Sequence, residues 1–127
     1  MNHTLEVYQG NNLIFFSDGK WLHPLLDFQK FLSQHNYNRA ALIVNDKIIG
    51  RAAALLIVHL GIKKVNAAIL SKPGKEALEF HGIQFEFEQL VDRIQCRTEA
   101  LLKDEFNAER AYQLIYELAH QTSQYRS

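Results

Sequence analysis

The chain has 127 residues, the size of one domain. Hydrophobic residues make up 47% and charged residues 22%, and 14 basic residues balance 14 acidic ones. This composition argues against intrinsic disorder, and the lack of a basic excess argues against a dedicated binder of duplex nucleic acid. The most apolar stretch, residues 52–60, is too short to span a membrane, and no signal peptide is predicted. The single cysteine excludes an internal disulfide, so we expect a cytoplasmic protein.

A β-hairpin and a helix are predicted at the start of the chain. Short strands at residues 5–8 and 13–16 flank the turn sequence Gln-Gly-Asn-Asn. The sequence Ser-Asp-Gly-Lys ends the second strand. A helix then follows to about Gln34, with leucines on one face and Pro24 in its first turn.

A central strand and a buried helix come next. The apolar run at residues 40–44 predicts a strand buried on both faces and ended by Asn45 and Asp46. Residues 49–60 are apolar nearly all round, which predicts a deeply buried helix that stops at Gly61.

The second half of the chain repeats this alternation of strand and helix. We expect a buried strand over residues 65–70, then a helix capped by Ser71 and ended by Gly82. Apolar and polar residues alternate over residues 83–88, as is typical of a strand near an edge with one face in water.

The C-terminal part is predicted to be helical. Residues 90–102 are expected to hold a short helix and a turn, and Asn107 caps a final helix. Its buried stripe is expected at Ala111, Ile115, Leu118 and Ala119. The whole order predicts one α/β domain over residues 1–127, with a three-layer α/β/α arrangement and a mixed sheet of about five strands.

Several kinds of chemistry lack their sequence motifs. The six histidines include no pair at the i, i+4 spacing of a helical zinc site, and there is no Cys-x-x-Cys. Glycine-rich phosphate and dinucleotide loops and the Gly-x-Ser-x-Gly motif are also missing. We therefore expect no metal and no cofactor. Cys96 has Arg93 and Arg97 nearby in sequence and is either a nucleophile or an inert buried thiol.

Two predicted helix starts point to a binding site. One follows the hairpin and the other follows the central strand, and ligands of open α/β sheets lie beyond the carboxyl ends of the strands. Helix N-termini present free N–H groups and partial positive charge, which suit an anion or a polar nucleobase edge. Two interpretations of Gly50 stay open. A glycine at this position allows either close packing of the helix or the close approach of a ligand.

The stretch at residues 41–56 resembles a known family. An apolar strand precedes Asp46, Lys47 and Gly50, then Arg51 and the triplet at residues 52–54. This order resembles the central pattern Asp-Lys-x-x-Gly-Lys-Ala-Ala-Ala of small bacterial proteins classed as domain of unknown function 1893, with Arg in place of Lys. The resemblance covers nearly the whole chain and implies a cytidine deaminase-like fold.

The resemblance does not extend to deaminase chemistry. In deaminases the two helix starts carry zinc ligands and a catalytic Glu, but the matching places here, residues 20–24 and 50–52, hold no Cys and only His23 could ligate. The family also carries an Asn-Arg pair and a later Cys-Pro-x-Glu turn. Cys96 and Glu99 match that turn without its Pro; alternatively, residues 96–98 match the Asn-Arg site.

Together these features predict a zinc-free protein that binds a small nucleotide-like or phosphorylated ligand, without duplex nucleic acid or membrane as a partner. The expected ligand-binding residues are Asp18, Gly19, Lys20, His23, Asn45, Asp46, Lys47, Gly50, Arg51, Cys96 and Glu99. Two alternatives stay open. One is a Cys96-dependent enzyme, and the other is a homo-oligomeric interaction module that uses the aromatic residues Phe85, Phe87, Tyr112 and Tyr116.

Overall fold

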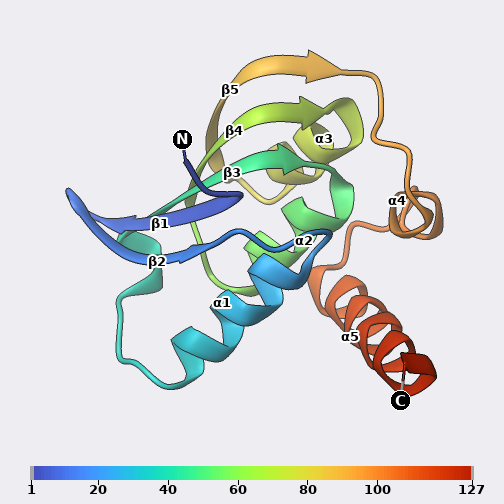
Figure 1. Ribbon diagram of the computed structural model, residues 1–127. Coiled ribbons are helices and arrows are strands. Elements are labelled where there is room, and N and C mark those ends of the chain that lie inside the picture. Colours follow the sequence, from blue (N-terminus) through green and yellow to red (C-terminus); the bar gives the residue numbers. More distant parts are fainter. Residues whose placement is uncertain (1, 127) are drawn as a thin grey trace.

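A five-stranded mixed sheet forms the centre of the computed structural model, which describes residues 2–126 and the side chains of residues 2–120 (Figure 1). The strand order is β2-β1-β3-β4-β5. β1 pairs antiparallel with β2 and β3, whereas β3, β4 and β5 are parallel. The strands are β1 (Leu5–Gln9), β2 (Asn12–Ser17), β3 (Leu42–Ile49), β4 (Lys64–Ser71) and β5 (Gln84–Val91).

Helices follow the strands in the predicted alternation. They are α1 (His23–Ser33), the 3-10 turn η1 (Arg39–Ala41), α2 (Arg51–His59), α3 (Lys72–Phe80), α4 (Arg97–Leu101) and α5 (Ala108–Arg126). The α/β class, the opening hairpin and the mixed sheet of five strands are confirmed. Within residues 2–126, no helix is long and apolar enough to cross a membrane.

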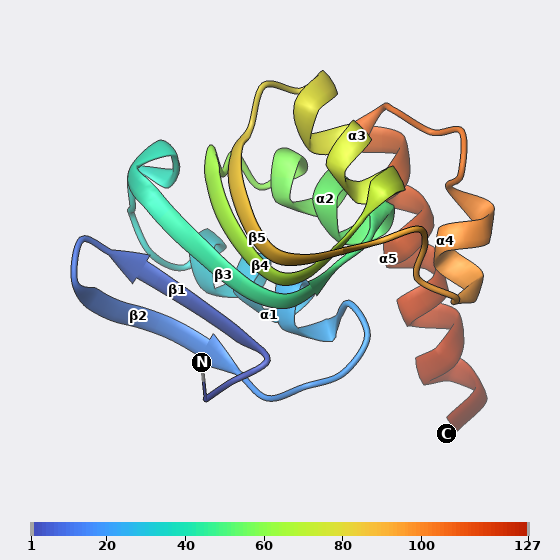
Figure 2. The ribbon, with the colours of Figure 1, turned by 90° about the horizontal axis from the view of Figure 1, so that it is seen from above.

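The core lies between one face of the sheet and the helices. Figure 2 shows α2 and α3 along the concave side of the sheet. Val7, Val44 and Val65 are neighbours in register across three strands, and all three are fully buried. α2 is buried over residues 51–57, as its apolar sequence predicts, because it packs on the sheet and also contacts α3 and α5.

The predicted helix ends are confirmed. The Ser71 hydroxyl accepts a hydrogen bond from the Gly74 N–H at 3.0 Å, and the Asn107 side chain accepts one from the Arg110 N–H at 3.0 Å. Gly61 and Gly82, with φ of +82° and +69°, follow α2 and α3 in the left-handed conformation.

The central strand departs from its prediction. Residues 39–41 form η1, and β3 then runs through Asn45 and Asp46 to Ile49 instead of stopping before them. β3 is held on both sides by β1 and β4, so ladder hydrogen bonds outweigh the turn preference of these polar residues. The strand is also not buried on both faces: Val44 is fully buried, whereas Ile43 on the opposite face is only half-buried.

The edge position of β5 and the buried stripe of α5 follow the sequence closely. β5 is an edge strand, as predicted. In α5, Ala111, Ile115 and Ala119 are buried, and Leu118 is half-buried beside them. Tyr112 stacks on His59 of α2, with 4.1 Å between the ring centres, so this aromatic residue packs inside the chain.

Candidate functional site

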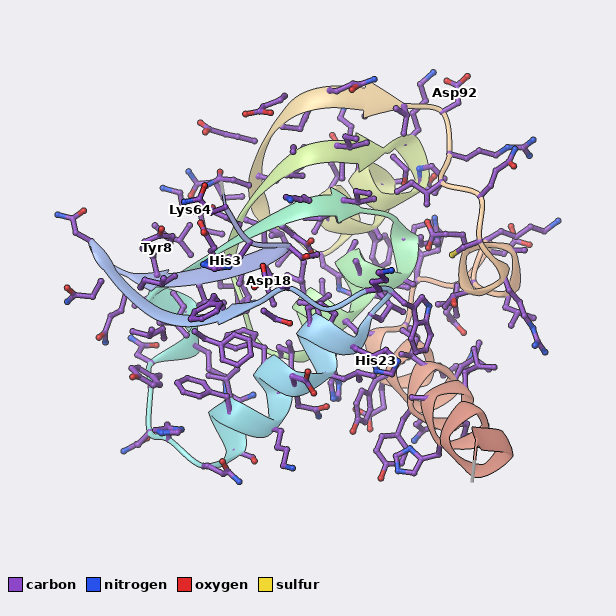
Figure 3. All side chains as sticks on the ribbon, viewed as in Figure 1. His3, Tyr8, Asp18, His23, Lys64 and Asp92 are labelled. Atoms are coloured by element: carbon purple, nitrogen blue, oxygen red, sulfur yellow. The ribbon has the colours of Figure 1, made fainter. Side chains whose placement is uncertain are left out.

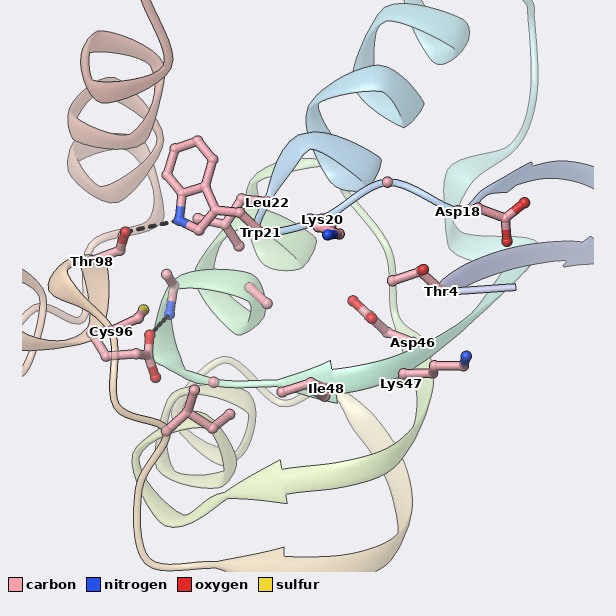
Figure 4. A pocket seen from close by; sticks show the side chains of 16 residues that line it. Thr4, Asp18, Lys20, Trp21, Leu22, Asp46, Lys47, Ile48, Cys96 and Thr98 are labelled. Carbon is pink, nitrogen blue, oxygen red and sulfur yellow. Dashed lines mark hydrogen bonds between the residues drawn. The ribbon is translucent and has the colours of Figure 1, made fainter. Parts of the chain in front are cut away.

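A pocket of about 460 Å³ opens at the carboxyl end of β3 (Figure 4). Its walls come from the segment before α1, the start of α2 and the segment that leads into α4. This is the position expected for a ligand in an open α/β sheet. The volume lies in the range of small-molecule sites.

Asp46 is the buried polar group of this pocket. Its side chain points from β3 into the cavity (Figure 4) and only 7% of the residue is exposed. Asp46 lies on the same side of β3 as Val44, the side that the helices cover. Burial raises the pKa of the Asp46 carboxyl to about 7, although hydrogen bonds from the N–H groups of Ile48 and Lys47 act in the opposite direction.

Glu99 occupies the N-terminus of α2. Its carboxylate accepts hydrogen bonds from the N–H groups of Arg51 at 2.7 Å and Ala52 at 2.8 Å. These donors have no partner within the helix, and the helix dipole favours a negative charge there. A Cβ on Gly50 would overlap the Glu99 carboxylate. Gly50 is therefore needed because another part of the same chain approaches it closely.

We expect Gly50→Ala and Glu99→Ala each to lower the free energy of unfolding by about 1–2 kcal/mol, because each removes the carboxylate cap of α2. Urea denaturation of the two single variants and the double variant measures this. The double variant should cost less than the sum, because the added Cβ then has no carboxylate to displace. Additive costs would show that Gly50 serves a purpose unrelated to Glu99.

Trp21 joins two walls of the pocket. Its indole N–H donates to the Thr98 hydroxyl at 3.0 Å, and Thr98 is buried (Figure 4). Trp21 has a φ of +57°, an uncommon conformation for a bulky residue. Such strain persists only where surrounding contacts fix it, and it often occurs at functional sites.

Comparisons with known proteins place the chain in a family. The sequence model of the family described as domain of unknown function DUF1893 matches residues 2–118. The chain belongs to the DUF1893 family. A crystal structure of a DUF1893 family protein from Thermotoga maritima has the same fold, with a TM-score of 0.79 and 22% identity. The match covers 90% of this chain and 79% of that one. No curated protein matches at a significant level.

Most of the residues predicted for a ligand line the pocket of this DUF1893 protein. The structure brings together Asp18, Gly19, Lys20, Asp46, Lys47, Gly50, Cys96 and Glu99. They come from three separate segments of the chain, which meet because β2 and β3 end at the same edge of the sheet and α4 folds back toward them.

Arg51 does not line the pocket, contrary to its prediction. It is 1% exposed, and its Nε donates to the Glu105 carbonyl at 2.6 Å. One terminal nitrogen donates to the Pro73 carbonyl at 3.4 Å, and the guanidinium lies 4.3 Å from the centre of the Phe106 ring. As the first residue of α2, Arg51 projects toward the start of α3 and the segment before α5, so its side chain contacts these parts of the chain and not the pocket.

Two other predicted residues also lie outside the pocket. His23 is at the start of α1 (Figure 3) and packs edge-on against Trp21, with 5.1 Å between the ring centres. Asn45 faces the opposite side of the sheet from Asp46, where its amide oxygen accepts from Asn66 at 2.9 Å. If the predicted strand had been extended past Val44, the alternation of side chains along it would have placed Asn45 and Asp46 on opposite faces of the sheet.

The sequence did not reveal the rest of the lining. The additional residues are Thr4, Trp21, Leu22, Ile48, Ala52, Ala53, Ile94 and Thr98. Most are apolar and carry no motif. One signal in the sequence could have pointed to Trp21 as a pocket residue. It is the chain's one tryptophan, and it directly follows two predicted ligand residues and precedes α1. Thr4 reaches the site because its carbonyl accepts from the Lys47 N–H at 3.1 Å.

The residues that the structure describes form no preformed metal-binding site. Among them, no group of three His, Cys, Asp or Glu side chains lies close enough to hold a metal ion. Cys96 lines the pocket and is exposed, so the interpretation as a buried thiol is wrong. It precedes α4 in extended backbone, where burial against the core is not required.

Proposed function

We propose that this pocket binds a small planar molecule that offers a hydrogen-bond donor beside an acceptor, such as a nucleobase or nucleoside. One observation carries the proposal: a buried carboxyl, Asp46, points into the pocket with a pKa near 7. At neutral pH such a group is protonated about half the time, so it can accept or donate a hydrogen bond. A ring nitrogen beside an amino group matches both of these capacities.

The remaining lining suits a flat ring. The walls around Asp46 are largely apolar and include Leu22, Ile48 and Ile94. The side chain of Trp21 adds an aromatic surface to the same cavity. Ligand sites commonly combine apolar walls with a few placed polar groups, because the apolar area drives binding and the polar groups fix orientation.

A phosphorylated ligand is the weaker form of this proposal. The first two N–H groups of α2, which were the predicted anion site, already bind the Glu99 carboxylate. A phosphate at this helix start would have to displace that carboxylate. Lys20 and Lys47 are exposed at the pocket and are the remaining positive groups. The likeness to cytidine deaminases stays a prediction that rests on the family resemblance.

A thermal-shift titration tests the proposal. Free nucleobases, nucleosides and the matching monophosphates are each added to the wild-type protein. A ligand at 100 times its Kd stabilises the folded state by about 2.7 kcal/mol, which raises the Tm by several degrees. We expect the nucleobase or nucleoside to shift the Tm at lower concentration than its monophosphate.

Substitutions at Asp46 provide the control. Asp46→Leu removes both hydrogen-bonding capacities and should weaken binding about tenfold or more, whereas Asp46→Asn keeps one donor and one acceptor and should retain part of the affinity. Asp104→Asn, on an exposed carboxyl away from the pocket, should leave it unchanged. The proposal would be rejected if none of the compounds raised the Tm, or if Asp46→Leu left the Tm shift unchanged.

A further inference from the structure

The face of the sheet opposite the buried valines carries a second open groove. Asn45, Asn66 and Glu86 are register neighbours across β3, β4 and β5 and point to this side, which we call the outer face. The groove measures about 590 Å³ and extends to Lys47, Ile48, Ala68, Ile69 and Glu88. Figure 2 shows α2 and α3 on the other side of the sheet, and no described helix residue lines this groove.

Apolar side chains lie within the groove. Ile48 is 51% exposed, although it belongs to a central strand. Its register neighbour Ile69 and the adjacent Ala68 are half-buried and line the same groove. In β3 the alternation of buried and exposed residues breaks at Lys47 and Ile48, which are both exposed, and both line this groove as well as the pocket. Large apolar side chains grouped with charges in this way are typical of protein interfaces.

Charges of opposite sign flank these apolar residues. Lys47 on β3 is exposed on one side, and Glu86 and Glu88 are exposed on β5 at the other. Within the described part of the chain, none of these three side chains has an ion pair. The outer face therefore has a positive margin, an apolar middle and a negative margin.

We propose that the outer face binds the outer face of a second copy of this chain. A two-fold axis makes the same patch serve both partners, so a patch with one positive and one negative margin can complement itself. With the axis along β4, Lys47 of each copy lies over Glu88 of the other, and Ile69 meets its own counterpart. A different partner would need a negative group opposite Lys47 and positive groups opposite Glu86 and Glu88. The proposal does not rest on the pocket ligand, although Lys47 and Ile48 line both the pocket and this groove.

Charge exchange tests the pairing. Sedimentation velocity from 1 to about 100 µM protein measures the dimer Kd. Lys47→Glu and Glu88→Lys each place like charges together twice in the dimer, so each should raise Kd about tenfold or more. The double variant Lys47→Glu/Glu88→Lys restores opposite charges and should recover dimerisation.

Two control variants separate this effect from net charge. Lys103→Glu and Glu79→Lys change the charge by the same amount on exposed residues outside the groove, and both should dimerise like the wild type. A monomeric wild-type protein at every concentration would overturn the proposal. So would a dimer that the single variants leave intact, or a double variant that fails to recover.

Discussion

Asp46→Asn should raise the free energy of unfolding by about 4 kcal/mol at pH 8 and change it little at pH 4. The Asp46 pKa is raised from 3.8 in the unfolded chain to about 7 in the folded protein. Between these values the unfolded state loses the proton while the folded state keeps it. The wild type therefore loses stability as pH rises through this range, by about 1.4 kcal/mol per pH unit. An amide of the same shape does not ionise and avoids this loss.

Urea denaturation from pH 4 to pH 8 measures this difference. The stability gain of Asp46→Asn over the wild type should grow between pH 4 and pH 7 and then level off. Asp104→Asn is the matched control, because it removes a carboxylate from an exposed position. If the difference in free energy of unfolding from the wild type is independent of pH for both variants, Asp46 does not carry a buried proton at neutral pH.

Arg51→Ala should lower the free energy of unfolding by about 3–5 kcal/mol. The guanidinium is buried, donates to the carbonyls of Glu105 and Pro73, and packs against the Phe106 ring. Truncation leaves both carbonyls without this donor and opens a cavity beside the ring. Because Arg51 lies outside the pocket, the folded variant should bind pocket ligands as the wild type does.

Arg110→Ala gives the comparison for Arg51, since the Arg110 side chain is exposed and its loss should change stability by less than about 0.5 kcal/mol. Circular dichroism under urea denaturation measures both variants at one pH. An Arg51→Ala protein as stable as the wild type, but with weakened ligand binding, would instead support the ligand role predicted from the sequence.

The alternation of strand and helix was predictable because it depends on local patterns. The apolar α2 is buried nearly all round, and the Ser71 and Asn107 caps make the expected hydrogen bonds. The end of β3 was not predictable in the same way. Asn45 and Asp46 favour a turn in isolation, but pairing with β1 and β4 keeps them in the strand.

The candidate site was partly predictable. Asp46, Lys47 and Gly50 were selected from the end of one strand, and all three line the pocket. What could not be foreseen was the direction of each side chain. Asn45 and Arg51 are close to Asp46 in sequence, yet they point to the outer face of the sheet and toward α3 respectively.

The sequence by itself determined the α/β class, the order of the elements and the region of the chain that forms the pocket, because periodicity and capping are local properties. Only the tertiary structure decided what occupies the start of α2. Glu99 is 48 residues from Arg51, and the hydrogen bond between them exists because α4 folds back over the pocket. The same is true of Asp46, whose raised pKa comes from burial by distant segments and not from its neighbours in sequence.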